Sequence, residues 1–298
     1  MYAVPDQTGR RFTVTGANSG TGREVTKRIA AAGGSVIMAV RSLERGAAAR
    51  NEILTEVPEA DLEVRQLDLA DLSSVKAFAQ TVLTDGRPLN VLINNAGVMA
   101  PPNRMETKDG FELQFGSNFL GPFALTTLLL PLLRETPDPR VATMTSGTAN
   151  FGSIHFDDLQ SQHRYRPNLA YAQSKLADML MSMQLADIAE REGWQLLSTM
   201  AHPGYTRTNL QSSGANLGRD KQKPPIQRTF LPSQTVEQGA EPLLFAAVDP
   251  AAQQGAYYGP GGALGLVGPT KRVRIPRSAK REGVETKLWV EAQKLTSV

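Results

Sequence analysis

The sequence of 298 residues contains no cysteine, only three histidines and little excess of charge. The absence of cysteine excludes disulfides, thiolate catalysis and cysteine-ligated zinc or iron–sulfur centres. His155, His163 and His202 lie in different expected elements and form no metal-binding motif, so we expect no metal site. A formal net charge of +3 is too small to indicate a nucleic-acid-binding protein.

Long apolar runs are also absent. The most apolar segment, residues 123–133, has 11 residues and includes two threonines and a proline, whereas a membrane span needs about 20 apolar residues. Residues 1–11 contain no apolar stretch of the kind that a secretory signal requires. We therefore expect a cytoplasmic protein that does not associate with a membrane.

The sequence does contain a regular alternation of short apolar segments and amphipathic ones. Six strands are predicted, at residues 10–15, 35–40, 62–66, 89–93, 140–145 and 195–200. Helical patterns separate them, and Gly116, Gly121 and Pro122 inside the longest one, residues 109–134, predict a kink near its middle. This alternation predicts an α/β fold with a doubly wound parallel sheet, the Rossmann fold.

No linker or internal repeat divides the chain, so we predict a single domain over residues 1–298. Residues 204–232 lose periodicity and collect Gly, Ser, Asn, Lys and Pro, which predicts a mobile loop beside the substrate. A helix is expected at residues 236–247. In the C-terminal extension, residues 255–298, we expect one more strand with turns within residues 255–268 and then a surface helix at 284–294.

The turn after the first expected strand is rich in glycine. Its sequence, TGANSGTG, opens an amphipathic helix whose N-terminal N–H groups can bind a pyrophosphate. At the start of a strand–helix series this turn favours a dinucleotide site, although a tight connection alone would use the same glycines. The residues assigned to the site are Gly16, Asn18, Ser19, Gly20, Thr21 and Gly22.

Arg41 follows the second expected strand, which ends beside the adenosine ribose in dinucleotide-binding folds. No carboxylate is present at that turn to accept a hydrogen bond from a ribose 2′-hydroxyl. A guanidinium instead suits a 2′-phosphate, so the predicted cofactor is NADPH rather than NADH. The alternative is a solvated arginine at the start of a helix.

Tyr171 and Lys175 lie four residues apart in an alanine-rich segment that predicts a helix, so their side chains share one face. An ammonium beside a phenol favours the phenolate, and such a pair can move a proton. Pairs with this spacing also occur on ordinary helix surfaces, and alone this one decides nothing.

Motifs in a fixed order resemble those of the short-chain dehydrogenase/reductase superfamily over nearly the whole chain. They are TGxxxGxG from Thr15, Asp68-Leu69, Asn94-Asn95-Ala96-Gly97, Asn118, Ser146, Tyr171-x-x-x-Lys175 and Pro203-Gly204. The segments AVRSLERG, SNFLGPF, HFDDL and AHPGYTRT are most similar to the retinol-dehydrogenase branch, as is the 25-residue step from Ser146 to Tyr171. Thr21 and Thr145 depart conservatively from that branch.

The resemblance implies a role for each matched residue. Tyr171 would donate and accept the proton, Ser146 would hold the substrate oxygen, and Lys175 would bind the nicotinamide ribose and lower the tyrosine pKa. Asn118 would hold a water that links Lys175 to solvent. The other implied cofactor contacts are Asp68, Leu69, Asn95, Ala96, Gly97, Pro203, Gly204, Thr206 and Thr208. Asn95 and its neighbours could equally stabilise the sheet, and Pro203 has a more structural character.

Together these residues predict an NADPH-dependent oxidoreductase that interconverts a carbonyl and an alcohol on a hydrophobic small molecule. The alternative is a non-catalytic NADP(H) sensor or scaffold on the same fold. Candidate lining residues for the substrate are Phe151, Tyr205, Leu210 and Leu217. The resemblance also implies a homodimer or homotetramer that pairs through the long helix and the Tyr171 helix.

Overall fold

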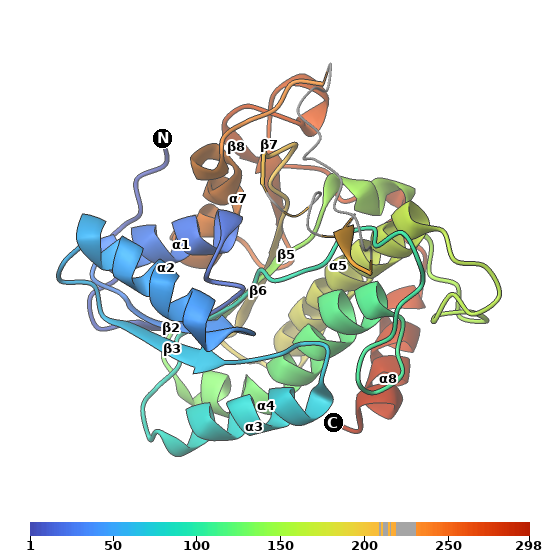
Figure 1. Cartoon of the computed structure of the whole chain (residues 1–298), viewed down its shortest axis with the longest axis horizontal. Coiled ribbons are helices and arrows are strands. Elements are labelled where there is room, and N and C mark those ends of the chain that lie inside the picture. Colours follow the sequence, from blue (N-terminus) through green and yellow to red (C-terminus); the bar gives the residue numbers. More distant parts are fainter. Residues whose placement is uncertain (209, 211–213, 215, 219–230) are drawn as a thin grey trace.

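The computed structural model describes residues 1–208, 210, 214, 216–218 and 231–298. A sheet of eight strands runs through its centre in the order β3-β2-β1-β4-β5-β6-β7-β8 (Figure 1). The strands are β1 (Arg11–Thr15), β2 (Ser35–Val40), β3 (Leu62–Gln66), β4 (Val91–Asn94), β5 (Arg140–Met144), β6 (Leu197–Ala201), β7 (Tyr257–Pro260) and β8 (Thr270–Arg272). The order reverses between β1 and β4, which confirms the predicted doubly wound parallel sheet.

All six strands predicted before residue 204 are present, and with the seventh expected in the C-terminal extension the sheet extends one strand further than predicted. β7 pairs parallel with β6, and β8 pairs antiparallel with β7 at the sheet edge. β7 confirms the strand expected within residues 255–268, whereas the edge strand β8 was not predicted. β8 has the sequence TKR and is largely exposed, so it carries no apolar signal that could reveal a strand.

Helices cover both faces of the sheet (Figure 1). Apolar side chains of α1 (Gly20–Ala31), α2 (Leu43–Glu56) and α7 (Val236–Val248) pack in one cluster on one face. Those of α3 (Leu72–Thr84) and α4 (Gly121–Glu135) pack on the other. Alternate residues of β2 enter the two clusters, because a strand buried on both faces needs apolar side chains on both.

The long helix before β5 starts later than predicted and contains the expected interruption. The prediction that it begins at residue 109 was wrong, because Gly110 has a φ of +83° and the buried Glu112 carboxylate accepts from the N–H groups of Gln114 and Phe115. A π-helical segment, η1 (Phe115–Leu120), then runs into α4 where a kink was predicted. This 21-residue helix is long and apolar enough to cross a membrane, but 72% of its apolar window is buried within the protein.

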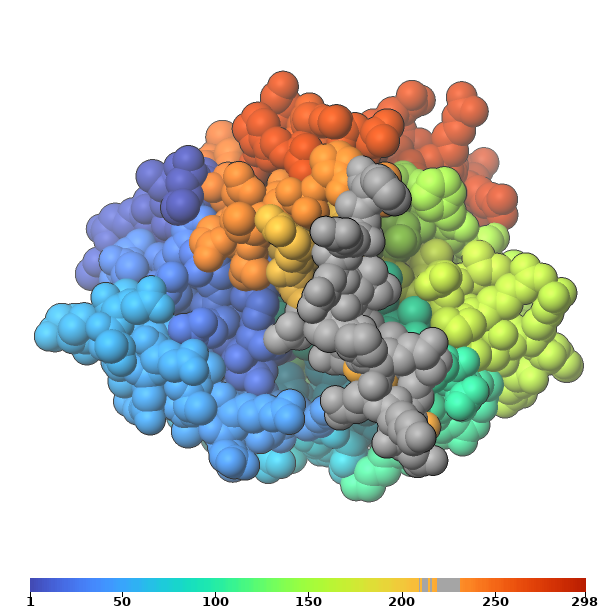
Figure 2. Space-filling view, turned by 45° about the horizontal axis from the view of Figure 1, so that its top comes forward, coloured from blue at the N-terminus to red at the C-terminus, as the bar shows by residue number. Residues whose placement is uncertain are grey.

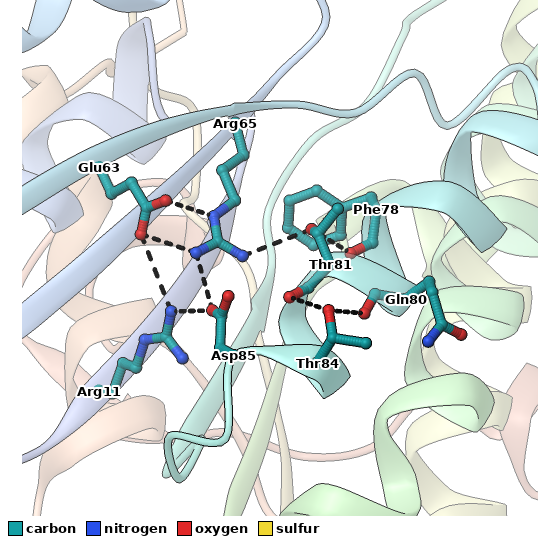
Figure 3. A network of polar contacts seen from close by, with 8 residues as sticks. All are labelled: Arg11, Glu63, Arg65, Phe78, Gln80, Thr81, Thr84 and Asp85. Carbon is teal, nitrogen blue, oxygen red and sulfur yellow. Dashed lines mark hydrogen bonds and ion pairs between the residues drawn. The ribbon is translucent and has the colours of Figure 1, made fainter.

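Near the amino ends of the strands, four charged side chains form a network (Figure 3). Arg65 donates to Glu63 at 2.7 and 2.8 Å and to Asp85 at 2.7 Å. Arg11 donates to Asp85 and lies 3.8 Å from Glu63. Burial raises the pKa of Asp85, but the hydrogen bonds from both arginines outweigh it and hold that pKa below its ordinary value. Each charge in this network has two partners.

The C-terminal helix α8 (Val284–Thr296) lies against α4 and against α5 (Pro167–Arg191). The rings of Phe123 and Trp289 are 4.8 Å apart, and Thr286 donates to Gln184 at 2.9 Å. The surface through which a second copy is expected to pair is therefore partly covered by α8. Figure 2 shows the C-terminal residues, in orange and red, beside the green residues that follow β5, where Ser278 donates to the Ala149 carbonyl.

Candidate active site

The predicted catalytic residues meet where β5 ends and α5 begins. Ser146 follows the last residues of β5, and Tyr171 and Lys175 lie in the first turns of α5. The buried Thr145 hydroxyl donates to the Lys175 carbonyl at 2.6 Å, and the Lys175 ammonium donates to the Met144 carbonyl at 3.0 Å. These two bonds fix the helix to the strand end. Thr145 thus has a positioning role that the sequence did not reveal.

Ser146 is the N-cap of a short 3-10 helix, η2 (Gly147–Phe151), and its hydroxyl accepts from the Thr148 N–H at 3.2 Å. A hydroxyl that accepts one hydrogen bond can still donate its own proton. The Ser146 hydroxyl also interacts with the Tyr171 phenol, since it lowers the pKa of Tyr171. The structure therefore brings these two hydroxyls together, as a shared substrate oxygen would require.

The Tyr171 side chain is 5% exposed, and burial is the largest influence on its protonation. Burial raises the pKa of Tyr171, the Lys175 ammonium and the Ser146 hydroxyl lower it, and the Asp178 carboxylate raises it; the balance lies above the ordinary value. Lys175 thus acts in the predicted direction but does not outweigh burial. Tyr171 is a protonated phenol at neutral pH.

Asp178 is a member of the site that sequence reasoning missed. Its carboxylate accepts from the Lys175 ammonium at 2.7 Å, and the two side chains are 1% and 4% exposed. Burial raises the pKa of Asp178 to about 7, against the lowering effect of Lys175. Burial lowers the pKa of Lys175, but Asp178 and Tyr171 together outweigh burial, and the pKa lies above its ordinary value. The signal was a carboxylate three residues after Lys175 in an otherwise apolar segment, LADMLM.

Asn118 lies in η1, and its side-chain amide is hydrogen-bonded to other groups of the protein. The amide nitrogen donates to the Val98 carbonyl at 3.0 Å and to the Ser174 hydroxyl at 2.9 Å, while the amide oxygen accepts from the Val98 N–H at 2.7 Å. A water held by Asn118 would therefore bind its main chain. Gly97 lies over this group, since a Cβ there would be 3.2 Å from the Asn118 oxygen and 3.6 Å from the Lys175 ammonium.

The glycine-rich turn packs tightly against the loop after β4. Gly16 has a φ of +67°, and a Cβ there would lie 3.1 Å from Ala96, while one at Gly22 would lie 2.4 Å from the Asn95 amide. Asn95 donates to the Thr15 carbonyl and accepts from the Thr21 hydroxyl, both at 2.9 Å. The Thr15 hydroxyl in turn accepts from the N–H groups of Asn95 and Ala96. Asn95, Ala96 and Thr21 therefore hold the two loops together.

The start of α1 fits a pyrophosphate. Its N-cap, Ser19, makes no side-chain capping bond, and the first turn carries no acidic residue, so the positive helix end is not neutralised locally. The Thr208 side chain lies over Gly20, 3.6 Å from where a Cβ would stand. Asn18, between Gly16 and Ser19, is half-buried in the same turn.

The turns after β2 and β3 are the predicted contacts for the adenosine end of the cofactor. Arg41 is exposed directly after β2, and its guanidinium has no hydrogen-bond or ion-pair partner among the described residues. One Asp68 oxygen accepts from the Ala70 N–H at 3.0 Å, and the buried Leu69 packs against Gly121, where a Cβ would lie 2.4 Å from the Leu69 carbonyl. A free guanidinium beside this turn fits the 2′-phosphate of the predicted cofactor.

The residues after β6 form a closed turn. The Pro203 carbonyl accepts from the buried Thr206 hydroxyl and, at 2.7 Å, from the Gln234 amide. Gly204 has a φ of +61° and packs against the Leu266 carbonyl. Pro203, Gly204 and Thr206 thus build the turn that carries Thr208 toward the phosphate-binding loop.

The predicted substrate-lining residues are only partly placed. Phe151 is 81% exposed, so its side chain lies on the surface. Tyr205, Leu210 and Leu217 are half-buried. Much of the predicted mobile loop, namely residues 209, 211–213, 215 and 219–230, lies outside the described residues.

Known proteins with the same motifs and fold are found in one family. The family model described as short chain dehydrogenase matches residues 10–216. Polyprenol dehydrogenase from Mus musculus is 37% identical over 297 residues, which cover 98% of this chain and 85% of the relative. Retinol dehydrogenase 14 from Homo sapiens is 35% identical over 302 residues, which cover 94% and 84%.

Solved structures agree with this assignment. An uncharacterized protein from Mycobacterium paratuberculosis is 39% identical with a TM-score of 0.81, covering 99% of this chain and 96% of that one. A short chain dehydrogenase from Escherichia coli CFT073 complexed with NADPH is 26% identical with a TM-score of 0.57, covering 72% and 84%. This chain therefore belongs to the short-chain dehydrogenase/reductase family, in its retinol-dehydrogenase-like branch.

Proposed function

We propose that this oxidoreductase uses NADPH to interconvert a carbonyl and an alcohol on a hydrophobic small molecule. One observation carries the proposal: the buried Tyr171 phenol interacts with both the Ser146 hydroxyl and the Lys175 ammonium. The names of the relatives, polyprenol dehydrogenase and retinol dehydrogenase, support a hydrophobic alcohol as one partner of the reaction. The E. coli relative complexed with NADPH supports the cofactor.

Each side chain has a defined task in the reduction. NADPH, when bound, supplies a hydride to the carbonyl carbon. Tyr171 donates its phenolic proton to the alkoxide that develops on the carbonyl oxygen, and Ser146 donates a hydrogen bond to the same oxygen. In the reverse direction the Tyr171 phenolate accepts the alcohol proton. The turns after β1, β2 and β6 would hold the cofactor, through Gly16, Ser19, Gly20, Arg41 and Thr208.

The test of the catalytic role is NADPH oxidation with a panel of aromatic and aliphatic ketones and aldehydes. Tyr171→Phe keeps the ring and removes the proton donor, and we expect a loss of about 10²- to 10⁴-fold in kcat/KM. Tyr258→Phe is the matched control, because it removes a buried phenol hydroxyl in the core cluster under α7. Undiminished activity in Tyr171→Phe contradicts the mechanism, and NADPH binding without turnover on the whole panel favours a sensor or scaffold.

The cofactor preference is tested at Arg41. Loss of a charge-assisted contact to a phosphate predicts that Arg41→Ala weakens NADPH binding about 10- to 100-fold and leaves NADH binding nearly unchanged. Lys76→Ala removes the same charge from an exposed position on α3 and serves as the control. Isothermal titration calorimetry measures both cofactors. Equal losses for NADPH and NADH would show that Arg41 does not bind the 2′-phosphate.

A further inference from the structure

The ammonium of Lys175 has three N–H donors, and the protein occupies two of them. One donates to the Met144 carbonyl at 3.0 Å and one to the Asp178 carboxylate at 2.7 Å. Both acceptors are buried, and the second Asp178 oxygen has no hydrogen-bond partner among the described residues. One donor of Lys175 therefore remains for the side of the site that faces Tyr171 and the cofactor.

Among the residues that the structure describes, no other charge competes at this position. Of the elements packed against α5, β6 carries no charged residue, and Arg140 of β5 donates instead to the Asp249 carbonyl. η1 contributes the neutral Asn118. The charges of α8 and of η4 (Arg277–Ala279) act elsewhere. Glu285 acts on Asp187, and Lys287 lies over the Phe156 ring. Glu291, Lys294 and Arg277, as well as Glu282 between these two elements, act on none of the three site residues. Besides burial, which is the largest influence, the pKa of Tyr171 is set by Lys175, Ser146 and Asp178.

We propose that Asp178 is a positioning residue whose buried negative charge fixes the Lys175 ammonium and sets the pH at which Tyr171 gains and loses its proton. The proposal rests on the proposed role of Tyr171 as proton donor. It assigns a function to a residue that contacts neither the substrate nor the reacting atoms.

The physical reason is charge compensation in a buried site. An isolated ammonium beside Tyr171 would strongly favour the phenolate, because solvent does not screen charges there. The Asp178 carboxylate offsets that charge at 2.7 Å, so Tyr171 sits beside a nearly neutral ion pair. Tyr171 then stays protonated at neutral pH, which is the form needed for carbonyl reduction. Alcohol oxidation needs the phenolate and is expected to rise with pH.

The direct test is Asp178→Asn, which keeps the shape and an oxygen acceptor for Lys175 but removes the charge. We expect the pH at which alcohol oxidation rises to move down by about one unit. Asp187→Asn is the matched control, because Asp187 is exposed and lies nine residues further along α5. Its profile should match that of the native protein. No shift in Asp178→Asn, or a shift to higher pH, would overturn the proposal.

A second measurement does not depend on turnover. Tyrosinate absorbance is followed after a pH jump in the native protein and in Tyr171→Phe. The difference between the two reports the protonation of Tyr171 alone. The same difference in the Asp178→Asn background should shift down by a similar amount. If Asp178→Asn shifts the Tyr171 titration but the native protein turns over no substrate, the proposed function is rejected and the role of Asp178 is kept. If turnover requires Tyr171 but Asp178→Asn leaves the Tyr171 titration unchanged, the proposed function stands and the role of Asp178 is rejected.

A double-variant cycle keeps the proposal testable if Asp178→Asn folds poorly. With Lys175 present, removal of the Asp178 charge should lower the thermal unfolding midpoint, because a buried ammonium loses its partner. In the Lys175→Met background the same substitution should raise the midpoint, because it removes an unpaired buried carboxylate. A change of the same sign in both backgrounds would show that Asp178 acts only by packing.

Discussion

Two groups of charged side chains lie at opposite ends of the parallel strands, and they differ in how many partners each charge has. Near the amino ends, Arg65 and Asp85 each contact two opposite charges, and the side chain of Glu63 is 47% exposed to solvent (Figure 3). At the carboxyl ends, Lys175 and Asp178 are almost fully buried, and within the described part of the chain each has only the other as an opposite charge. In the first group each charge keeps a partner if one is removed, and solvent partly screens the charges. In the second group neither holds.

The difference teaches where a fold can hold a charge that acts on another group. Solvent and multiple partners weaken the influence of any one charge in the amino-end network. A single buried pair has the opposite property, because removal of either member leaves the other uncompensated in a medium of low dielectric constant. Only the carboxyl-end pair can therefore control the protonation of a neighbour such as Tyr171.

The largest effect on stability is expected from Lys175→Met, which leaves Asp178 unpaired in the core. We expect the free energy of unfolding to fall by about 3–5 kcal/mol above neutral pH. The folded pKa of Asp178 is raised from 3.8 to about 7 even beside Lys175, and loss of the ammonium raises it further. A raised folded pKa means that stability is retained below the unfolded pKa and lost as pH rises through the folded one.

Urea unfolding measures this loss, which should be smaller near pH 5 than near pH 8. Lys287→Met is the control, because it removes an exposed lysine of α8, the helix that packs against α5, and this lysine lies over the Phe156 ring. A loss independent of pH would show that Asp178 is not an ionised partner of Lys175.

A smaller effect is expected from Asp85→Asn, which removes the carboxylate shared by Arg11 and Arg65. Arg11 is 3% exposed and would keep only Glu63, 3.8 Å away, so we expect a loss of about 1–3 kcal/mol. Because the folded pKa of Asp85 is lowered, its contribution to stability is fully present at pH values above the unfolded pKa of 3.8. The contribution is lost as pH falls through the folded pKa. Urea midpoints near pH 3 and near pH 7 check this, and a difference that persists in acid would contradict it.

The sequence predicts most of this architecture because buried strands must be apolar on both faces, as in β2. It does not predict β8, whose polar residues lie at an exposed edge, or the start of the long helix, which depends on the Glu112 side chain capping residues that follow it. Local pattern cannot report a cap formed by a buried carboxylate in an irregular turn.

The same limit applies to the site. Ordered motifs identify Ser146, Tyr171 and Lys175, since their spacing along the chain is fixed by the chemistry they share. Asp178 is invisible to that reasoning, because a carboxylate in a helix is usually a solvated residue. Its burial arises from β5, η1 and α8 covering α5 on several sides, which only the three-dimensional structure shows.

The smallest effect is expected from Arg65→Met. Asp85 keeps Arg11 as a partner, and Glu63 can regain hydration, so the free energy of unfolding should fall by only about 1 kcal/mol or less. Because the network is partly exposed, added salt should reduce even this difference, whereas it should leave the Lys175→Met loss almost unchanged. Thermal unfolding of both variants at low and high salt makes the comparison. If Arg65→Met destabilised the protein as much as Lys175→Met, the number of partners would not be what separates the two groups of charges.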